Sequence, residues 1–334
     1  MARNRVAKDI TIKLGYLNAR FLTSKGKIFD LITELKNNDI DIMFIAETKS
    51  KISSNFDVEH GKLWIGEGKM NKINEKSTGV SGGMAIYVKN NINIYKLEIY
   101  NNRIAVVQQL NNKVLTTYIG IYAPTDDNND ETKNKFFAEV NEVIELLINE
   151  DKKNKDIIVR KPVTLGDFNG YIGRNKMKNI HVGYYMCSEV NDNGIRVLEL
   201  AMKLNISVIN TYYKRRNSSR FTWSNTSKTQ RSEIDYIVGE RKLITNFRIL
   251  TFSQFFVNSD HRAISCKYQI PKVILRRRKM KLHSTVDIDV TNKIDWNFTC
   301  NSTTQKAVDE EYMQLIQKIK RTLKPKDKDE KCLF

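Results

Sequence analysis

Cysteine and proline are both scarce in this sequence of 334 residues, which contains four of each. The cysteines lie far apart and form no CxxC pair, so the sequence predicts neither a zinc site nor a disulfide framework. A reduced, intracellular protein is the simplest interpretation. The four residues concerned are Cys187, Cys266, Cys300 and Cys332.

Long apolar runs are missing as well. No segment approaches the roughly 18 consecutive apolar residues of a membrane span. The basic start MARNRVAKD lacks the apolar core of a signal peptide. We therefore expect neither a membrane partner nor a secretory leader.

Acidic residues are few relative to basic ones: 38 Asp and Glu stand against 56 Lys and Arg, for a net charge of +18. Such a balance favours polyanionic partners, either nucleic acid or acidic membranes. The alternative is a Lys-, Asn- and Ile-rich composition without a binding role, and charge alone leaves both interpretations open. The 40% apolar content is typical of a globular protein.

Composition changes after Pro271. Residues 272–334 contain the run RRRKMK, few long apolar runs and one candidate helix near residues 305–323. We predict a folded domain over 1–271 and a basic linker or partly ordered extension over 272–334. The run RRRK is either a nuclear import or nucleic-acid patch, which would make the protein nuclear, or a solvated charge run.

Short apolar strands with a few amphipathic helices between them fill the first 271 residues. Helices are predicted after the cap residue Ser24, over 136–147 and over 194–205. A regular alternating βα barrel is disfavoured, because the helices are too few. Strands are predicted over 10–18, 40–47, 82–89, 113–124, 156–167, 206–210, 219–224, 231–238 and 262–270.

Polar residues end several of these apolar strands. In VTLGDFNG, Asp167 and Asn169 are two residues apart, and such side chains point to the same side of an extended segment. Each polar strand end alone has a structural explanation as a turn, cap or surface residue. Their repetition predicts an active site at one edge of the sheets. The others are Asn18, Glu47, Tyr122, Asp235 and the pair Asp260–His261.

These residues lie in motifs that resemble the endonuclease/exonuclease/phosphatase superfamily, which includes deoxyribonuclease I and the abasic-site endonucleases. The resemblance covers about residues 9–270. It is closest to the endonuclease domains of non-LTR retrotransposons and to craniofacial development protein 2-like sequences. The motifs, in the expected order, are LGYLNAR, IDIMFIAETK, IGIYAPT, TLGDFNGYIG, SEIDYIV and NSDHRAI.

The resemblance implies an α/β (α+β) fold, a four-layer α/β/β/α sandwich with two mostly antiparallel sheets. It also implies a phosphodiesterase site that uses Mg²⁺, with Mn²⁺ as the alternative ion. Carried over residue by residue, Glu47 is the principal metal carboxylate, with Asn18 and Asp260 near the ion. Mg²⁺ prefers oxygen ligands and keeps several waters, so one or two carboxylates suffice.

The same resemblance implies the catalytic roles. Asp167 would orient and deprotonate the attacking water, and Asn169 would help to hold the water or the phosphate. Tyr122 would stabilise the phosphate or the departing oxygen. His261, oriented by Asp235, would contact a phosphate oxygen, which suits an imidazole that a carboxylate keeps protonated.

Two positions depart from the motifs of other superfamily members. Arg20 stands where some members have an acid, which is typical of the retrotransposon-like branch. The glutamate motif reads AETK rather than QETK, which leaves the carboxylate of Glu47 in place.

Cationic and aromatic residues alternate over 212–231, in YYKRRNSSRFTWSNTSKTQR. Cations can bind phosphates while aromatic rings stack on bases, so this segment predicts a nucleic-acid face. A solvated loop is the alternative, and the two aromatic residues of RFTWS can instead belong to the core. The predicted nucleic-acid contacts are Lys214, Arg215, Arg216, Arg220, Trp223 and Arg231.

The sequence therefore predicts a Mg²⁺-dependent endonuclease of the retrotransposon type. It would nick one strand of double-stranded DNA and leave a 3′-hydroxyl and a 5′-phosphate, with RNA as the alternative substrate. Two other functions stay open: a phosphatase of the same superfamily acting on phosphoinositides or nucleotides, and a non-catalytic nucleic-acid-binding module. Oligomeric state and target preference are not predicted.

Overall fold

The computed structural model describes residues 10–74, 77–173, 180–186 and 190–270, together with residue 314. The chain divides into two compact units, Met1–Val273 and Ile274–Phe334. The predicted C-terminal extension lies outside the described residues apart from residue 314, so its boundary and its order stay predictions.

The first unit contains two seven-stranded sheets. In the first sheet the strand order is β17-β18-β1-β2-β7-β4-β3, and only the β1–β2 pair is parallel. Its strands are β1 (Ile10–Asn18), β2 (Ile42–Ala46), β3 (Ser54–Val58), β4 (Gly61–Ile65), β7 (Met84–Lys89), β17 (Ile244–Ile249) and β18 (Ile264–Ile270).

The second sheet has the order β13-β16-β12-β10-β9-β8, with β11 paired to β10. Its pairs are antiparallel except β10–β11 and β10–β12. Its strands are β8 (Ile94–Ile99), β9 (Ile104–Asn111), β10 (Val114–Tyr122), β11 (Ile158–Val159), β12 (Val163–Asp167), β13 (Ser207–Val208) and β16 (Asp235–Gly239).

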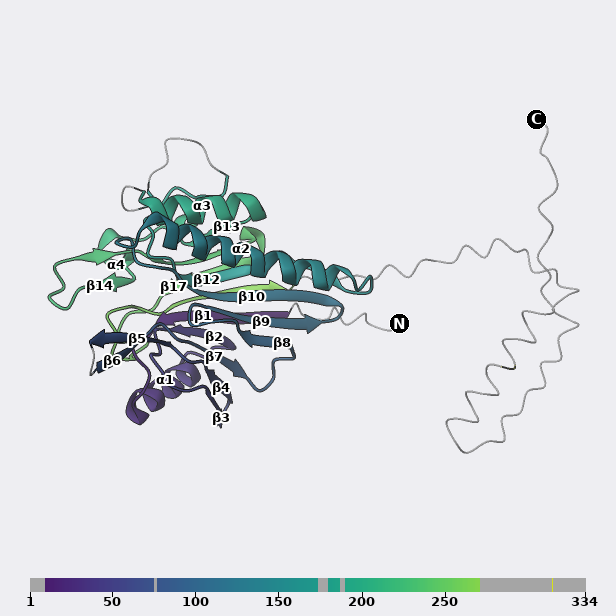
Figure 1. The fold of residues 1–334 in the computed structure, drawn as a ribbon. Coiled ribbons are helices and arrows are strands. Elements are labelled where there is room, and N and C mark those ends of the chain that lie inside the picture. The colour runs from purple at the N-terminus through teal and green to yellow at the C-terminus, as the bar shows by residue number, and fades with distance from the viewer. Residues whose placement is uncertain (1–9, 75–76, 174–179, 187–189, 271–313, 315–334) are drawn as a thin grey trace, which may run out of the picture. The chain divides into compact units, whose positions relative to one another are not determined.

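Three layers of buried apolar residues hold four layers of structure together. One cluster joins the two sheets, a second joins the second sheet to α2 (Asp130–Lys152) and α3 (Asp192–Leu204), and a third joins the first sheet to α1 (Lys25–Asn37). Figure 1 shows α2 and α3 over the second sheet and α1 under the first. The predicted α/β/β/α sandwich is confirmed.

The sheets approach each other very closely at Gly120 of β10. A Cβ atom there would lie 2.4 Å from a ring carbon of Phe44 on β2, closer than any normal carbon contact. The glycine therefore lets a phenylalanine ring of one sheet rest on the backbone of the other.

Side-chain caps mark where α1, α2 and α3 begin. The Ser24 hydroxyl accepts a hydrogen bond from Lys27 N at 3.3 Å, which makes Ser24 the N-cap of α1. The helix α2 begins earlier than predicted, because Asn129 caps it at Thr132 N. No helix among the described residues is both long and apolar enough to cross a membrane.

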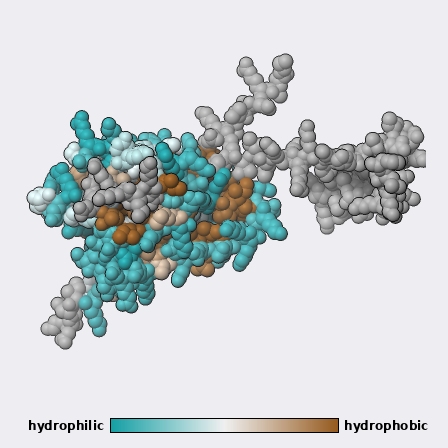
Figure 2. All heavy atoms as spheres, turned by 90° about the horizontal axis from the view of Figure 1, so that it is seen from above, coloured by the Kyte–Doolittle hydropathy of each residue, from teal (hydrophilic) through white to brown (hydrophobic). Residues whose placement is uncertain are grey.

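Smaller elements complete the unit. Two two-stranded ribbons, β5–β6 and β14–β15, project at the same end of the sandwich (Figure 1). The face formed by α2 and α3 is mainly hydrophilic with separate hydrophobic patches (Figure 2). The remaining elements are β5 (Lys69–Asn74), β6 (Ser77–Ser81), β14 (Trp223–Ser224), β15 (Arg231–Ser232), α4 (Asn217–Arg220) and the 3₁₀ turns η1 (Ile209–Tyr212) and η2 (Arg241–Leu243).

Candidate active site

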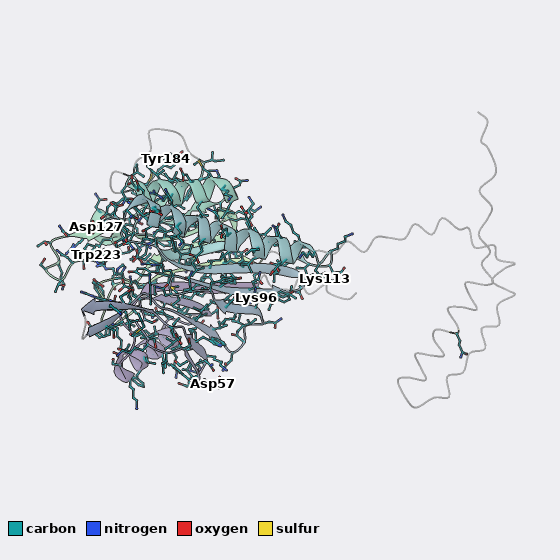
Figure 3. All side chains as sticks on the ribbon, in the orientation of Figure 1. Asp57, Lys96, Lys113, Asp127, Tyr184 and Trp223 are labelled. Atoms are coloured by element: carbon teal, nitrogen blue, oxygen red, sulfur yellow. The ribbon has the colours of Figure 1, made fainter. Side chains whose placement is uncertain are left out.

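A cleft of about 420 Å³ opens at one end of the two sheets. Figure 3 labels two residues of its lining, Asp127 and Trp223, at that end, whereas Lys96 and Lys113 lie at the opposite end. All eight side chains predicted to be catalytic or metal-binding lie in this cleft or in direct contact with its lining. The lining includes Arg20, Glu47, Tyr122, Asp126, Asp127, Asp167, Asn169, Tyr171, Trp223, Asp260 and His261.

Glu47 follows β2 directly, with a left-handed backbone (φ 52°) that turns its side chain into the cleft. Its Oε1 accepts hydrogen bonds from the Tyr122 hydroxyl at 2.6 Å and from Asn18 Nδ2 at 3.2 Å. Its Oε2 lies 3.1 Å from Lys49 Nζ. Burial raises the pKa of Glu47, but these hydrogen bonds and the lysine charge outweigh burial and lower it, so the carboxylate is ionised.

Asn18 connects the carboxylates of the two sheets. Its Nδ2 donates to Asp167 Oδ2 at 3.0 Å as well as to Glu47, while its Oδ1 accepts from Arg20 N at 2.9 Å. This set of partners fixes which way the amide points. Asn18 therefore positions two carboxylates with its nitrogen, and its place near a metal ion stays a prediction.

Asp167 ends β12 and is 1% exposed. Its two oxygens accept from Asn18 Nδ2 and from the backbone N–H of Asn169, the latter at 3.0 Å. Burial, followed by the charge of Asp235, raises the pKa of Asp167 to about 7. The carboxyl thus titrates near neutrality, unlike a free aspartate at about 3.9.

The predicted placement of Asp167 and Asn169 on one side required the strand to continue through Asn169, and it does not. The strand ends at Asp167, and Asn169 has a left-handed backbone (φ 47°). Its Nδ2 donates to Ala123 O at 3.0 Å. The residue lines the cleft because of this turn, not because residues 167 and 169 share one face of a strand.

His261 and Asp235 form a buried pair. The imidazole Nδ1 lies 3.0 Å from Asp235 Oδ2, and Nε2 lies 3.8 Å from Asp167 Oδ2. Burial opposes the charged imidazole, but Asp235, then Asp167 and Asp260, outweigh burial and raise the pKa of His261 to about 9. The imidazolium therefore lies between two carboxyl groups, with Asp235 at Nδ1 and Asp167 near Nε2.

Asp260 also lines the cleft. Its Oδ2 accepts from Arg20 Nη1 and from the indole N–H of Trp223, each at 3.2 Å. Arg20, whose side chain is 53% exposed, is the basic residue at the position where some members of the superfamily that the motifs resemble have an acid. Its contact with Asp260 gives the departure a structural role.

The oxygen-rich lining fits a hard divalent cation such as Mg²⁺ or Mn²⁺. The Oε2 atom of Glu47 is paired only with the partly exposed Lys49 among the contacts described above, so it is the oxygen best placed to bind an ion. Among the described residues, one group of three acidic or imidazole side chains has its ligand atoms within 4.8 Å of one another: Asp167, Asp235 and His261. In that group Nδ1 of the imidazole is already bonded to Asp235.

The predicted nucleic-acid contacts are dispersed. Lys214 and Arg216 are exposed, and Trp223 lines the cleft. Arg215 is half-buried, where it donates to Phe247 O at 2.9 Å and stacks on the Phe247 ring.

Arg220 is corrected. It is 3% exposed, its guanidinium donates to the carbonyls of Tyr185 and Tyr213, and it lies 3.6 Å from the carboxylate of Glu233. A guanidinium buried among these partners is closed off from a phosphate in solution, so Arg220 has a structural role.

Sequence patterns missed two supporting residues. The Ser259 hydroxyl donates to Asn18 O at 2.6 Å and accepts from His261 N at 3.1 Å. Lys27, buried on α1, donates from Nζ to Ala19 O at 2.7 Å and to Asn258 O at 2.8 Å. Ser259 stands inside the NSDH motif and could have been noticed, whereas a lysine in an amphipathic helix gives no sign of burial.

Curated proteins resemble this chain at low identity. Craniofacial development protein 2 of Bos taurus is 21% identical over 289 residues, which cover 84% of this chain and 45% of that protein. The protein of the same name from Tragulus javanicus is 20% identical, with 84% and 46% covered. The chain thus spans less than half the length of these relatives. No protein-family model matches the sequence.

Solved structures share the fold. The AP endonuclease LMAP from Leishmania major has a TM-score of 0.53 at 12% identity, with 78% of this chain and 88% of that chain covered. A 3′ phosphatase from Neisseria, NExo, bound to a product DNA hairpin, has a TM-score of 0.52 at 14% identity, with 77% and 99% covered. The endonuclease domain of TRAS1, a telomere-specific non-LTR retrotransposon, has a TM-score of 0.48 at 15% identity, with 78% and 100% covered.

The TRAS1 score is too low to carry an argument, so a retrotransposon origin stays a prediction. The other two neighbours are a nuclease and a DNA-bound phosphatase, and their likeness to this chain establishes its architecture. The chain has the fold of the deoxyribonuclease I-like endonuclease/exonuclease/phosphatase superfamily.

Proposed function

We propose that this protein is a Mg²⁺-dependent endonuclease that nicks one strand of double-stranded DNA and leaves a 3′-hydroxyl and a 5′-phosphate. The observation that carries the proposal is the cleft in which Asn18 joins Glu47 to Asp167 while Asp167 lies 3.8 Å from the His261–Asp235 pair. A phosphodiester hydrolase needs a base, a cationic donor and a metal carboxylate, and this cleft holds a candidate for each.

Asp167 is the proposed general base. Its pKa of about 7 lets it accept a proton from water at neutral pH. The hydrogen bonds from Asn18 and Asn169 hold its carboxyl in one orientation. His261, kept positive by Asp235, is the proposed donor to a phosphate oxygen through Nε2.

Tyr122 acts through Glu47 in this proposal. Burial and the charge of Glu47 raise the pKa of Tyr122 well above its usual value, so the phenol stays protonated. Its hydroxyl donates a hydrogen bond to the carboxylate of Glu47. Glu47, together with Asp260, would hold the divalent ion. When bound, such an ion neutralises phosphate charge and lowers the pKa of a coordinated water.

A DNA substrate is supported by the net charge of +18 and by exposed cations such as Lys214 and Arg216. The 3′ phosphatase from Neisseria that shares the fold is bound to a DNA hairpin. A nuclear location, suggested by the run RRRK, belongs to the same proposal.

Nicking of supercoiled plasmid tests the proposal. The wild-type protein should convert plasmid to the open circle with Mg²⁺ and not with EDTA. Asp167→Asn and Glu47→Gln, which keep side-chain size, should each lower the rate at least a hundredfold, because base and metal effects are commonly that large. End-mapping of the product should give 3′-hydroxyl and 5′-phosphate ends.

A matched control is Asp57→Asn. Asp57 is exposed on β3, away from the cleft (Figure 3), so this variant should nick like the wild type. If a well-folded wild type fails to nick plasmid but releases phosphate from a 3′-phosphorylated oligonucleotide, the protein is a phosphatase and the proposed endonuclease function is wrong.

A further inference from the structure

Two arginines stack on one phenylalanine ring beside the cleft. The guanidinium carbons of Arg262 and Arg231 lie 3.5 Å and 4.7 Å from the centroid of the Phe221 ring. Arg262 also lies 5.5 Å from the Phe252 ring centroid. The result is a stack of cations and aromatic rings, which we call the arginine stack (Arg231, Phe221, Arg262 and Phe252).

Within the described part of the chain, the cations of the arginine stack have no anionic partner. Neither Arg231 nor Arg262 has a carboxylate oxygen within 4.0 Å among the described residues, whereas Arg20 pairs with Asp260 and Arg220 with Glu233. Arg262 Nε is buried and has no hydrogen-bond partner in that part of the chain. Burial, then the positive charge of Arg231, lowers the pKa of Arg262.

The stack is built onto the strands that carry the cleft residues. Trp223 and His261, which line the cleft, form an antiparallel bridge. Arg262 is the next residue after His261, and its N–H donates to Thr222 O at 2.6 Å. Arg231 is the strand partner of Ser224, the residue after Trp223. Arg262 is thus next to the cleft residue His261 in the sequence, and Arg231 is paired with the sequence neighbour of the cleft residue Trp223.

Stacking leaves the edges of a guanidinium free. A guanidinium whose face lies on an aromatic ring still presents its N–H donors in its own plane, where they match the oxygens of a phosphate. Two like charges on one ring repel each other, and an anion between or beside them removes that cost. An anion is therefore the ligand that the unpaired arginine stack lacks.

We propose that Arg231 and Arg262 form a phosphate subsite that binds a nucleic-acid strand next to the cleft, separate from the phosphate to be hydrolysed. The identity of the ligand as nucleic acid rests on the proposed function. The subsite explains why Arg262 is half-buried without a carboxylate. It also gives the predicted contact Arg231 a partner that sequence patterns did not indicate.

Binding of a fluorescein-labelled 20-base-pair duplex tests the subsite, measured over a range of salt concentrations in the Asp167→Asn background. Arg231→Gln and Arg262→Gln should each weaken binding about tenfold. Each should also flatten the plot of log K against log salt, by at most about 0.9. Because both residues bind one phosphate, the double variant should lose less affinity than the product of the two single losses.

Arg241→Gln is the matched control. Arg241 also stacks on an aromatic ring, that of Tyr212 at 4.3 Å, but it follows the far end of β16 from Asp235. This variant should keep the wild-type slope. Slopes for Arg231→Gln and Arg262→Gln that equal the slope of Arg241→Gln would overturn the subsite.

Folding and catalysis are separated from the subsite by two further measurements. If Arg262→Gln loses its near-ultraviolet circular dichroism, the exposed residue Arg231 decides alone, and an unchanged slope for Arg231→Gln overturns the proposal. A changed slope in a protein that never nicks plasmid would keep the subsite and reject the endonuclease. Plasmid nicking by a protein whose variants leave the salt slope unchanged would keep the endonuclease and reject the subsite.

Discussion

At the scale of single residues, the cleft depends on one buried amide. Asn18 is 1% exposed and donates to carboxylates that belong to different sheets. Its backbone carbonyl accepts from Ser259, which in turn accepts from the N–H of His261. The proposed base Asp167, the proposed metal carboxylate Glu47 and the imidazole of His261 are therefore positioned through one side chain and its main chain.

The buried Asp167 and His261 predict how stability depends on pH without metal. The pKa of Asp167 is raised from about 3.8 to about 7, so its contribution to stability is complete below pH 3.8 and is lost as the pH rises through 7. The pKa of His261 is raised from about 6.5 to about 9, so its contribution is lost as the pH rises through 9. Urea midpoints measured in EDTA should fall over this whole range.

Asp167→Asn should remove the part of this slope that lies between pH 4 and pH 7, because an amide does not titrate. The part between pH 6.5 and pH 9 should remain, since Asp235 still faces the imidazole. A wild-type midpoint that rises with pH between 4 and 7 would contradict the raised pKa of Asp167.

The identity of the cleft residues could be predicted from sequence, but not their contacts. Asp167 and His261 stand in short motifs that any reader of the chain can find. The orientation of the Asn18 amide depends on Glu47 and Asp167, which are 29 and 149 residues away. Arg220 looked available in a basic loop, and only the fold brings Glu233 and two carbonyls to its guanidinium.

At the scale of elements, the two sheets each carry part of the site. In the first sheet, Asn18 ends β1 and Glu47 follows β2 directly. In the second sheet, Tyr122, Asp167 and Asp235 belong to β10, β12 and β16. The spacing between the sheets therefore sets the distance between the carboxylates of Glu47 and Asp167, the proposed metal ligand and the proposed base. At Gly120 the ring of Phe44 from the other sheet packs directly on the backbone of β10.

Gly120→Ala should destabilise the protein by about 1–3 kcal/mol, because the added methyl group overpacks a closed interface. It should also slow plasmid nicking more than it weakens DNA binding, since the hydrogen bonds of Asn18 span the sheets. Urea unfolding and nicking rates measure the two effects. Nicking at the wild-type rate in a destabilised variant would show that the site tolerates a change in sheet spacing.

Gly26→Ala is the control for this substitution. Gly26 lies in α1, and a Cβ atom there would meet nothing within 4 Å. Replacing a helical glycine by alanine typically stabilises by about 0.5–1 kcal/mol. The two alanines should therefore shift the urea midpoint in opposite directions.

Strands with continuous apolar runs were predictable, and several strands that carry polar residues were not. The apolar runs of β2 and β10 are buried throughout and gave clear patterns. The edge strand β3 alternates half-buried and exposed residues and carries polar ones. In β9, Gln108 and Gln109 interrupt the apolar pattern, yet both are buried because Asp151 and Tyr118 bond them. Pro162 divides the predicted strand 156–167 into β11 and β12.

At the scale of the whole molecule, the first unit is closed by its own first and last strands. Ile10 of β1 is the strand partner of Ile270 of β18. Every strand of both sheets lies between these two residues. The order of motifs in the sequence was enough to predict this sandwich, whereas the described residues say nothing about the extension that follows.

Deleting 272–334 should leave a folded, metal-dependent nuclease, because no strand of either sheet is removed. Near-ultraviolet circular dichroism and the urea midpoint should match those of the full chain. DNA affinity should fall at low salt, since the deleted run RRRKMK carries positive charge. A truncated protein without near-ultraviolet signal would place the domain boundary further along the chain.

The pairing of Ile10 with Ile270 has a consequence for how the domain can be carried. Strand β1 ends at the cleft with Asn18, and β18 runs antiparallel to it, so both outer ends of this pair leave the sandwich at the edge remote from the cleft. A domain with adjacent ends can be inserted into a surface loop of another protein as a single module. Such a host would hold the module from behind while its cleft stays open to DNA.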